Sequence, residues 1–273
     1  MTSGPPAIYP SLHGKTVVVS GGAEGIGAAT VELFALQGCK VLFLDIAKTA
    51  AQQTIDHVIS RSKEARERRG PSIKAPIFYY CNLINLSDLE AIATKILEEH
   101  GPVHVLVNNA AATGSSARLD TSSVTPGAWD FNVNANLRHV FFLSQFFIPE
   151  MKSAGGGSIV NVGSITWRIP AAGQPVYGAC KAAIMGLTRV QSKEVGGANI
   201  RINSVMPGAI ATRKQREEVL MPEYRTEVMQ AQSLQRDLLP EDVAKVIVFM
   251  GSDEASGVTG STYVVDGGWV SDP

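Results

Sequence analysis

Three side chains that together can move a proton on an alcohol oxygen lie in the second half of the chain: Ser164, Tyr177 and Lys181. Tyr177 and Lys181 are four residues apart, so on an α-helix they share one face. An ammonium beside a phenol favours the phenolate, which predicts that Lys181 lowers the pKa of Tyr177 from its ordinary value of about 10. Ser164 can hydrogen-bond the same substrate oxygen. The trio predicts interconversion of an alcohol and a carbonyl, although a Tyr-x3-Lys pair alone is more often plain helix surface.

A glycine-rich turn near the start of the chain favours the catalytic interpretation of Tyr177 and Lys181. The spacing Gly21-x3-Gly25-x-Gly27 directly follows an apolar strand-like run and opens a helical pattern. Such a turn lets backbone N–H groups and the helix N-terminus face a pyrophosphate, whereas by itself it could be ordinary loop chemistry. We therefore predict dinucleotide contacts from Gly21, Glu24, Gly25, Ile26 and Gly27.

Asp45 ends the second strand-like run, 18 residues after Gly27. A carboxylate at this place can bind the ribose hydroxyls of adenosine and repels a 2′-phosphate. Glu24, Ile46 and Ala47 supply no arginine or lysine for that phosphate, which predicts NAD rather than NADP as the cofactor, with Ile46 also in contact. Asp45 can equally cap the helix that follows, and the two roles are compatible.

Further cofactor contacts are expected where the third and fourth strand-like runs end. The Asn82 amide can bond the adenine edge, and the small residues after Asn108 leave room for a ribose or adenine. Turn formation is the alternative for Asn108 and Asn109. The residues predicted to touch the cofactor here are Asn82, Leu83, Asn109, Ala110 and Ala111.

Apolar runs alternate with helical patterns along the whole chain, which predicts a doubly wound (Rossmann-type) α/β domain with helices on both faces of a parallel sheet. Strands are predicted at residues 16–20, 40–45, 77–81, 103–107, 158–162, 201–205 and 262–265. Helices are predicted at residues 26–37, 47–68, 86–100, 126–151, 176–196 and 240–250. Since no linker or repeat interrupts the pattern, residues 1–273 are expected to form one domain of about seven strands. Residues 208–237, polar and broken by Pro222, are predicted to form a substrate lid.

Composition narrows the function classes. The net charge of −1 disfavours nucleic acid and anionic membrane surfaces as partners. No run approaches the ~20 apolar residues of a membrane span, and the N-terminus has no signal-peptide pattern. Three cysteines fit no metal spacing and no disulfide framework, so we expect no metal and a cytoplasmic location.

Over roughly residues 12–270 the chain resembles the short-chain dehydrogenase/reductase family. The motifs that carry the resemblance are Ser20-Gly-x3-Gly-Ile-Gly, Asn108-Asn-Ala, Asn136, Ser164, Tyr177-x3-Lys181 and Pro207-Gly208. The resemblance implies that Asn136 holds a water linking Lys181 to solvent, with Asn134 as a rival by position. It implies that the nicotinamide is covered by Pro207, Gly208, Ile210 and Thr212. It also implies a homotetramer built on the helices at 126–151 and 176–196.

The chain departs from the usual family pattern at four positions: Ser20, Asn82, Ala111 and His139. Ser20 keeps the hydroxyl of the usual threonine, and Asn82 keeps an acceptor while losing the charge of the usual aspartate. Ala111 replaces a glycine, and His139 replaces a small residue. His139 is read as a packing residue in preference to a catalyst. None of the four removes a catalytic group.

A narrower resemblance, to bacterial NAD-dependent aldose 1-dehydrogenases of the xylose type, rests on five segments. They are Ala7-Ile-Tyr-Pro-Ser-Leu, Asn136-Leu-Arg-His, Gly163-Ser-Ile-Thr-Trp, Thr212-Arg-Lys-Gln and Val264-Val-Asp-Gly-Gly-Trp. It implies oxidation of a pentose or 6-deoxyhexose to the lactone. The substrate residues predicted are Ser164, Trp167, Arg168, Gln174 and Tyr177.

Several alternatives stay open at this point. Trp167 can stack on a sugar or pack in the core, and Arg168 and Gln174 can bind hydroxyls or serve as surface polarity. A carbonyl reductase or a secondary-alcohol dehydrogenase of another substrate class is the rival function. A non-catalytic dinucleotide-binding protein is a remote second rival.

Overall fold

The computed structural model describes residues 7–67, 73–114 and 117–270, with the side chains of 63–67 left aside. Its strands are β1 (Thr16–Ser20), β2 (Lys40–Asp45), β3 (Ile77–Tyr80), β4 (Val105–Asn108), β5 (Gly157–Val162), β6 (Ile200–Pro207) and β7 (Thr262–Val265). They form one parallel sheet in the order β3-β2-β1-β4-β5-β6-β7. The predicted seven-stranded doubly wound sheet is confirmed, and strand ends differ from the prediction by at most two residues.

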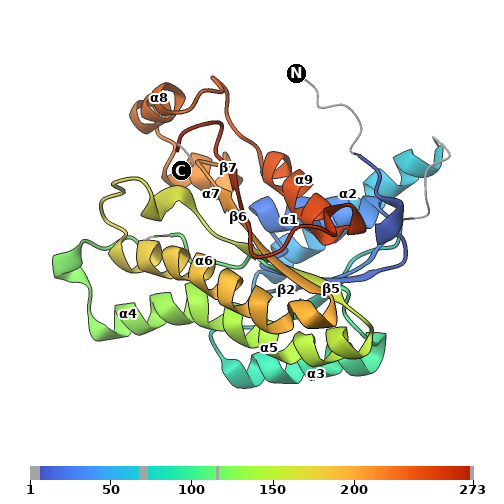
Figure 1. The fold of residues 1–273 in the computed structure, drawn as a ribbon. Coiled ribbons are helices and arrows are strands. Elements are labelled where there is room, and N and C mark those ends of the chain that lie inside the picture. Colours follow the sequence, from blue (N-terminus) through green and yellow to red (C-terminus); the bar gives the residue numbers. More distant parts are fainter. Residues whose placement is uncertain (1–6, 68–72, 115–116, 271–273) are drawn as a thin grey trace.

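Helices cover both faces of the sheet (Figure 1). They are α1 (Gly25–Leu36), α2 (Lys48–Glu67), α3 (Leu86–His100), α4 (Pro126–Val133), α5 (His139–Ser153), α6 (Pro175–Val195), α7 (Arg213–Glu218), α8 (Pro222–Ala231) and α9 (Pro240–Gly251). Helices α1, α2 and α9 lie on one face, and α3 to α6 lie on the other. The end predicted for α2 at Arg68 lies outside the described residues. Within the described ranges, no helix has the length and apolarity to cross a bilayer.

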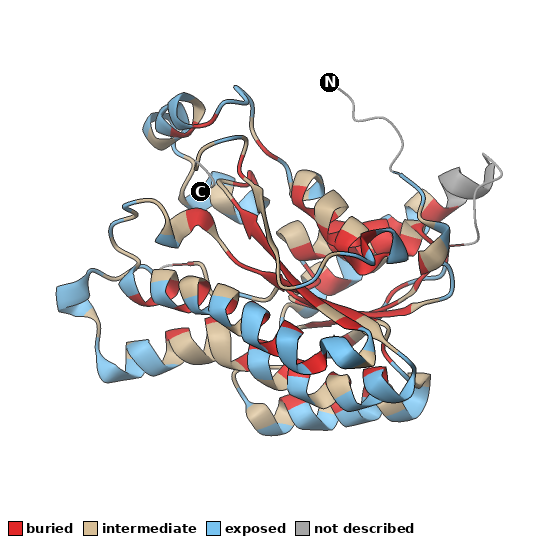
Figure 2. Cartoon of the chain, in the orientation of Figure 1, coloured by how far each residue is buried: buried red, intermediate tan, exposed pale blue. Residues whose placement is uncertain are grey.

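The core consists of two apolar layers that the sheet separates (Figure 2). Every residue of β1 is buried, because a central parallel strand has helices on both sides. Phe34 and Phe43 lie in the layer under α1 and α9, and Leu106 and Phe147 lie in the layer under α3 and α5. Burial on both faces explains why the strands read as unbroken apolar runs in the sequence.

The register brings the carboxyl ends of the central strands level with one another. Ser20 pairs with Asn108, and Asn108 pairs with Asn161. The chain builds outward from β1 to β3 on one side and from β4 to β7 on the other. The gap between β1 and β4 is therefore the switch point at which ligands of open α/β sheets bind.

The segment 208–237 has more structure than its sequence suggests. It contains the helices α7 and α8, and a bridge from Ile210 to Leu238 closes its two ends. Pro222 does not break a helix but opens α8, where its missing N–H costs nothing. The segment lies beyond the sheet on the same side as the end of β6 (Figure 1), so it is placed to cover the carboxyl edge.

Candidate active site

A cleft of about 610 Å³ opens at the carboxyl edge of the sheet. Its lining joins the first glycine turn, the ends of β2 to β6 and the root of the 208–237 segment. The predicted cofactor residues that line it are Gly21, Glu24, Gly25, Ile26, Asp45, Ile46, Asn82, Leu83, Asn109, Ala110, Ala111, Tyr177, Lys181, Pro207, Gly208, Ile210 and Thr212. Gly27 alone among the predicted cofactor contacts does not reach the cleft surface.

Gly27 instead allows the turn to close. A Cβ atom at Gly27 would lie 1.8 Å from the Gly21 carbonyl oxygen and 2.6 Å from Asn109 Nδ2. Asn109 Nδ2 itself donates to the carbonyl oxygens of Ser20 at 3.1 Å and Gly21 at 2.9 Å. The Ser20 hydroxyl accepts from the Asn109 and Ala110 N–H groups at 3.0 and 3.2 Å. The hydroxyl kept at Ser20 thus joins the ends of β1 and β4.

Asp45 is held in place by three backbone donors. Its Oδ2 accepts from the Ala23 N–H at 3.0 Å, and its Oδ1 accepts from Ile46 at 2.8 Å and Ala47 at 3.0 Å. The bonds to Ile46 and Ala47 lie just before Lys48, the first residue of α2, so they shape the turn into the helix and do not cap its N–H groups. Because Asp45 also lines the cleft, its position remains compatible with contact to a ribose.

The glycine turn fits an anionic cofactor group. Glu24 precedes α1 without making a capping hydrogen bond, so the first N–H groups of the helix are left for another acceptor. The Glu24 carboxylate pairs instead with Arg213, the first residue of α7. A Cβ atom on Gly25 would lie 3.0 Å from Thr212 Cγ2, so the start of the 208–237 segment packs directly over the turn.

Ser164, Tyr177 and Lys181 meet on the floor of the cleft. Ser164 follows β5 and caps a short 3₁₀ turn, Ile165–Trp167, by accepting from the Thr166 N–H at 3.1 Å. Tyr177 and Lys181 lie on the first turns of α6, and the Ser164 hydroxyl hydrogen-bonds the Tyr177 hydroxyl. Lys181 is 2% exposed and donates to the Val162 carbonyl at 2.8 Å. Its Nζ lies 5.6 Å from the centre of the Tyr177 ring.

The electrostatics of the phenol differ from the prediction. Burial raises the pKa of Tyr177 to about 12, and the opposing effects of the Ser164 hydrogen bond and the Arg118 charge are smaller. Burial also lowers the pKa of Lys181 to about 8. Desolvation therefore outweighs the expected effect of the ammonium in this structure, and Tyr177 begins as a neutral phenol.

Asn136 lies in a π-helical turn, Asn134–Arg138, that separates α4 from α5 where one continuous helix was predicted. Asn136 is fully buried, and its Oδ1 accepts from the Ala112 N–H at 2.9 Å. A π turn displaces the backbone carbonyls from regular helical bonding, which is why such turns recur at functional sites. The neighbouring His139 is fully buried, and burial and the Lys181 charge lower its pKa to about 3, so its ring stays neutral.

The predicted substrate residues divide into two groups. Ser164, Gln174 and Tyr177 line the cleft, whereas Trp167 and Arg168 do not. In the tight 3₁₀ turn Ile165 faces inward and is buried, while Trp167 is 37% exposed. The Arg168 guanidinium lies 5.7 Å from the centre of the Trp167 ring. The structure therefore pairs Trp167 and Arg168 with each other outside the cleft.

The cleft also has lining residues that the sequence did not predict, among them Arg118, Thr166, Ile169 and Tyr224. Arg118 lies between β4 and α4, and Tyr224 lies on α8. No motif marks either residue, because their meeting depends on how two distant loops fold over the sheet. Among the described residues, no group of three histidines, cysteines or carboxylates could hold a metal ion.

Comparison with known proteins identifies the class. The sequence profile described as enoyl-(acyl carrier protein) reductase matches residues 21–270. The chain belongs to the short-chain dehydrogenase/reductase family and is an oxidoreductase that acts on CH–OH groups. Family membership confirms the expected cofactor class, a nicotinamide dinucleotide.

The relatives and a solved structure agree with this class over nearly the full length. The chain is 41% identical to D-xylose 1-dehydrogenase of Caulobacter vibrioides over 96% of its own length and 98% of the relative. It is 36% identical to a probable galactose dehydrogenase of Rhizobium meliloti, with 97% and 98% covered. A 7α-hydroxysteroid dehydrogenase complexed with NADH and 7-oxo glycochenodeoxycholic acid superposes with a TM-score of 0.85 at 28% identity, covering 97% of each chain. The narrower resemblance to aldose dehydrogenases is confirmed at the level of sequence similarity.

Replacing Tyr177 with phenylalanine tests the catalytic assignment. We expect the Tyr177→Phe variant to lose about 10²–10⁴-fold in kcat, since it lacks the proton-transfer group but keeps the buried ring. Dinucleotide affinity, measured by protein fluorescence titration, should change less than about twofold, because the ring still fills its place. Tyr9→Phe, a change on the N-terminal segment away from the cleft, serves as the matched control. Turnover of Tyr177→Phe at the rate of the unmodified protein would remove Tyr177 from the mechanism.

Proposed function

We propose that the protein oxidises an aldose, a pentose or a 6-deoxyhexose, at C1 to the lactone, with NAD as hydride acceptor and Tyr177 as general base. The observation that carries the proposal is the half-buried Ser164 beside the buried Tyr177 and Lys181, in a cleft whose other end is lined by the glycine turn. The sugar assignment is supported by the likeness to D-xylose and galactose dehydrogenases over nearly the full chain.

The proposed reaction breaks the C1–H bond, whose hydrogen leaves as a hydride, and the O1–H bond, whose hydrogen leaves as a proton. When bound, a nicotinamide dinucleotide would supply the acceptor for the C1 hydrogen and its electron pair. Tyr177 takes the O1 proton as phenolate, and the Ser164 hydroxyl donates a hydrogen bond that holds the forming carbonyl oxygen. Burial keeps the Tyr177 phenol near pKa 12 even with Lys181 Nζ 5.6 Å from the ring, so we propose that the positive charge of a bound oxidised nicotinamide would add to that of Lys181 and favour the phenolate.

The proton is proposed to leave by way of the π turn. Lys181 and Asn136 are both buried behind Tyr177, so a proton taken from the sugar has no direct contact with bulk solvent. We propose that a water held beside Asn136 accepts it from Lys181. The interruption between α4 and α5 supports this route, because carbonyls released from regular helical bonding can hold such a water.

The choice of NAD over NADP rests on Asp45 and on the two residues that directly follow it. Ile46 and Ala47 follow Asp45 on the cleft wall, and neither can bind a phosphate. Arg213, which lies over the glycine turn, is already paired with Glu24. A 2′-phosphate would therefore meet an anion without a compensating partner.

A double substitution tests that cofactor choice. The unmodified protein should prefer NAD by more than about tenfold in kcat/KM, and Asp45→Ser with Ile46→Arg should narrow or reverse the ratio. Since Asp45 also accepts three backbone hydrogen bonds, the ratio of the two cofactors is the informative quantity, with the unfolding midpoint measured in parallel. Asp56→Ser, an exposed change on α2, should leave the ratio unaltered. A preference of the unmodified protein for NADP would contradict the role given to Asp45.

A panel of aldoses tests the substrate assignment. We expect NADH to form with at least one of xylose, arabinose, rhamnose or fucose, and we expect hydroxylamine to trap the lactone before it hydrolyses to the aldonic acid. The matching 1-deoxy sugar should be inert, because it has no anomeric hydroxyl to deprotonate. The structural likeness to a hydroxysteroid dehydrogenase keeps a secondary-alcohol dehydrogenase as the second candidate. Turnover of steroids or simple secondary alcohols with none of any aldose would establish that alternative.

We also propose a homotetramer. Large apolar side chains are exposed on the helices expected to form the contacts, with Trp129 51%, Phe141 40% and Val190 58% exposed. Covering such side chains is a common reason for association. Sedimentation at low micromolar concentration should give four times the chain mass of 29.0 kDa. A single species at the monomer mass would refute the assembly.

A further inference from the structure

Two side chains from distant segments converge at the substrate end of the cleft. Arg118 belongs to the loop between β4 and α4, and Tyr224 belongs to α8 of the 208–237 segment. Both line the same cleft as Tyr177. The positive charge of Arg118 acts on both phenols and opposes the rise that burial causes in the pKa of each. The guanidinium therefore lies near the general base and near Tyr224 at once.

The donors of Arg118 are free for a ligand. In the described part of the chain Arg118 forms no ion pair and no side-chain hydrogen bond. The carboxylates that line the cleft are Glu24 and Asp45, and both lie at the cofactor end, where Glu24 is paired with Arg213. A guanidinium carries five N–H donors in a fixed plane, so Arg118 can serve two neighbouring oxygen atoms of one ligand.

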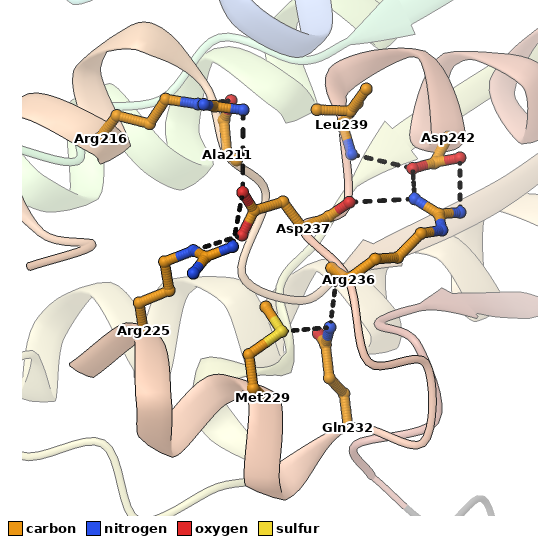
Figure 3. A network of polar contacts seen from close by, with 9 residues as sticks. All are labelled: Ala211, Arg216, Arg225, Met229, Gln232, Arg236, Asp237, Leu239 and Asp242. Carbon is orange, nitrogen blue, oxygen red and sulfur yellow. Dashed lines mark hydrogen bonds and ion pairs between the residues drawn. The ribbon is translucent and has the colours of Figure 1, made fainter. Parts of the chain in front are cut away.

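Tyr224 lines the cleft from α8, and a polar network anchors its neighbours in the 208–237 segment (Figure 3). The next residue, Arg225, donates from Nε to Asp237 Oδ1 at 2.9 Å. Arg216 donates to the Ala211 carbonyl at 3.1 Å and lies 4.0 Å from Asp237 Oδ2. Arg236 pairs with Asp242 at 2.8 Å, which ties the end of the segment to the start of α9. These contacts fix the first turn of α8, and with it the half-buried Tyr224.

We propose that Arg118 and Tyr224 form a subsite that binds the ring hydroxyls of the aldose away from C1. The inference rests on the proposed sugar substrate and names the residues that select it. Vicinal hydroxyl oxygens accept from two parallel N–H groups on one edge of the guanidinium, and the Tyr224 hydroxyl can donate or accept beside them. A site built to bond hydroxyls discriminates against an analogue that lacks one, because its polar groups are then left unpaired. The preference for one sugar over another would then depend on Arg118 in the loop between β4 and α4 and on Tyr224 in the 208–237 segment.

Monodeoxy analogues of the best aldose, combined with Arg118→Met and Tyr224→Phe, test the subsite. Arg118→Met should lower kcat/KM by about 10–100-fold, mainly through KM, as expected for hydrogen bonds to a charged group. In the unmodified protein, removing at least one ring hydroxyl from the aldose should lower kcat/KM by a similar factor. In Arg118→Met the same deoxy position should cost less than about twofold, because its partner is already absent. In Tyr224→Phe, removal of a neighbouring sugar hydroxyl should likewise cost less than about twofold in kcat/KM.

The outcomes separate this inference from the proposed function. If no aldose is turned over, both fail together. If an aldose is turned over but each deoxy position costs the same in Arg118→Met as in the unmodified protein, the subsite alone is refuted. A variant that loses kcat and shifts the alkaline limb of the pH profile without changing KM would assign Arg118 only to tuning Tyr177, which also refutes it. Lys74→Met, an exposed change before β3 at the amino edge of the sheet, is the matched control for loss of a positive charge and should leave all values unchanged.

Discussion

The catalytic end of this molecule depends on keeping one ammonium group, that of Lys181, buried under the cleft. A charged amine removed from water costs several kcal/mol unless fixed partners replace its hydration. Here the Val162 carbonyl accepts at 2.8 Å, and burial brings the pKa of Lys181 down to about 8. The Lys181 amine thus remains mostly protonated near neutral pH, but its pKa lies only a little above that pH. Any shift of α6 against β5 would move Lys181 away from the Val162 carbonyl and leave its buried charge without an acceptor. The scaffold must therefore hold these two elements rigidly.

Buried amides supply that rigidity. Asn108 at the end of β4 donates to Asn161 Oδ1 on β5 at 2.8 Å, and Asn161 donates in turn to Thr188 on α6 at 3.0 Å. The chain of hydrogen bonds is fully buried, where unpaired amides would be costly and paired ones specify a single arrangement. It links the strand beside the glycine turn to the helix that carries Tyr177 and Lys181. The two ends of the cleft are therefore held in register through side chains that do not line the cleft.

The sequence was sufficient for the parts of this structure that depend on local patterns. Apolar runs between helical periods predicted the sheet, and the glycine turn, Asp45 and the Tyr-x3-Lys pair predicted most of the cleft wall. The π turn at Asn136 was not visible, because its residues continue the helical pattern on both sides. Trp167 was placed by its nearness to Ser164 in sequence, but a 3₁₀ turn directs consecutive side chains to different sides. The predicted direction of the Tyr177 pKa also failed, because burial depth is a tertiary property that spacing does not record.

The difference between features set by local sequence patterns and features set by tertiary structure also bears on substrate choice. Ser164 and the glycine turn directly follow strands, and Tyr177 and Lys181 lie on α6, which the Lys181 hydrogen bond ties to the end of β5. A similarly folded chain complexed with a bile-acid derivative shares 28% identity with this one, whereas D-xylose 1-dehydrogenase shares 41%, so the scaffold accommodates very different alcohols. What can differ more freely are the long segments beyond the carboxyl edge, since they lie outside the seven paired strands of the sheet. In this chain those segments are the loop after β4 and residues 208–237, and the polar network around Asp237 shows that the second of them is a built surface and not a loose connection. We therefore expect selectivity to depend on these two segments, which the sequence motifs do not mark.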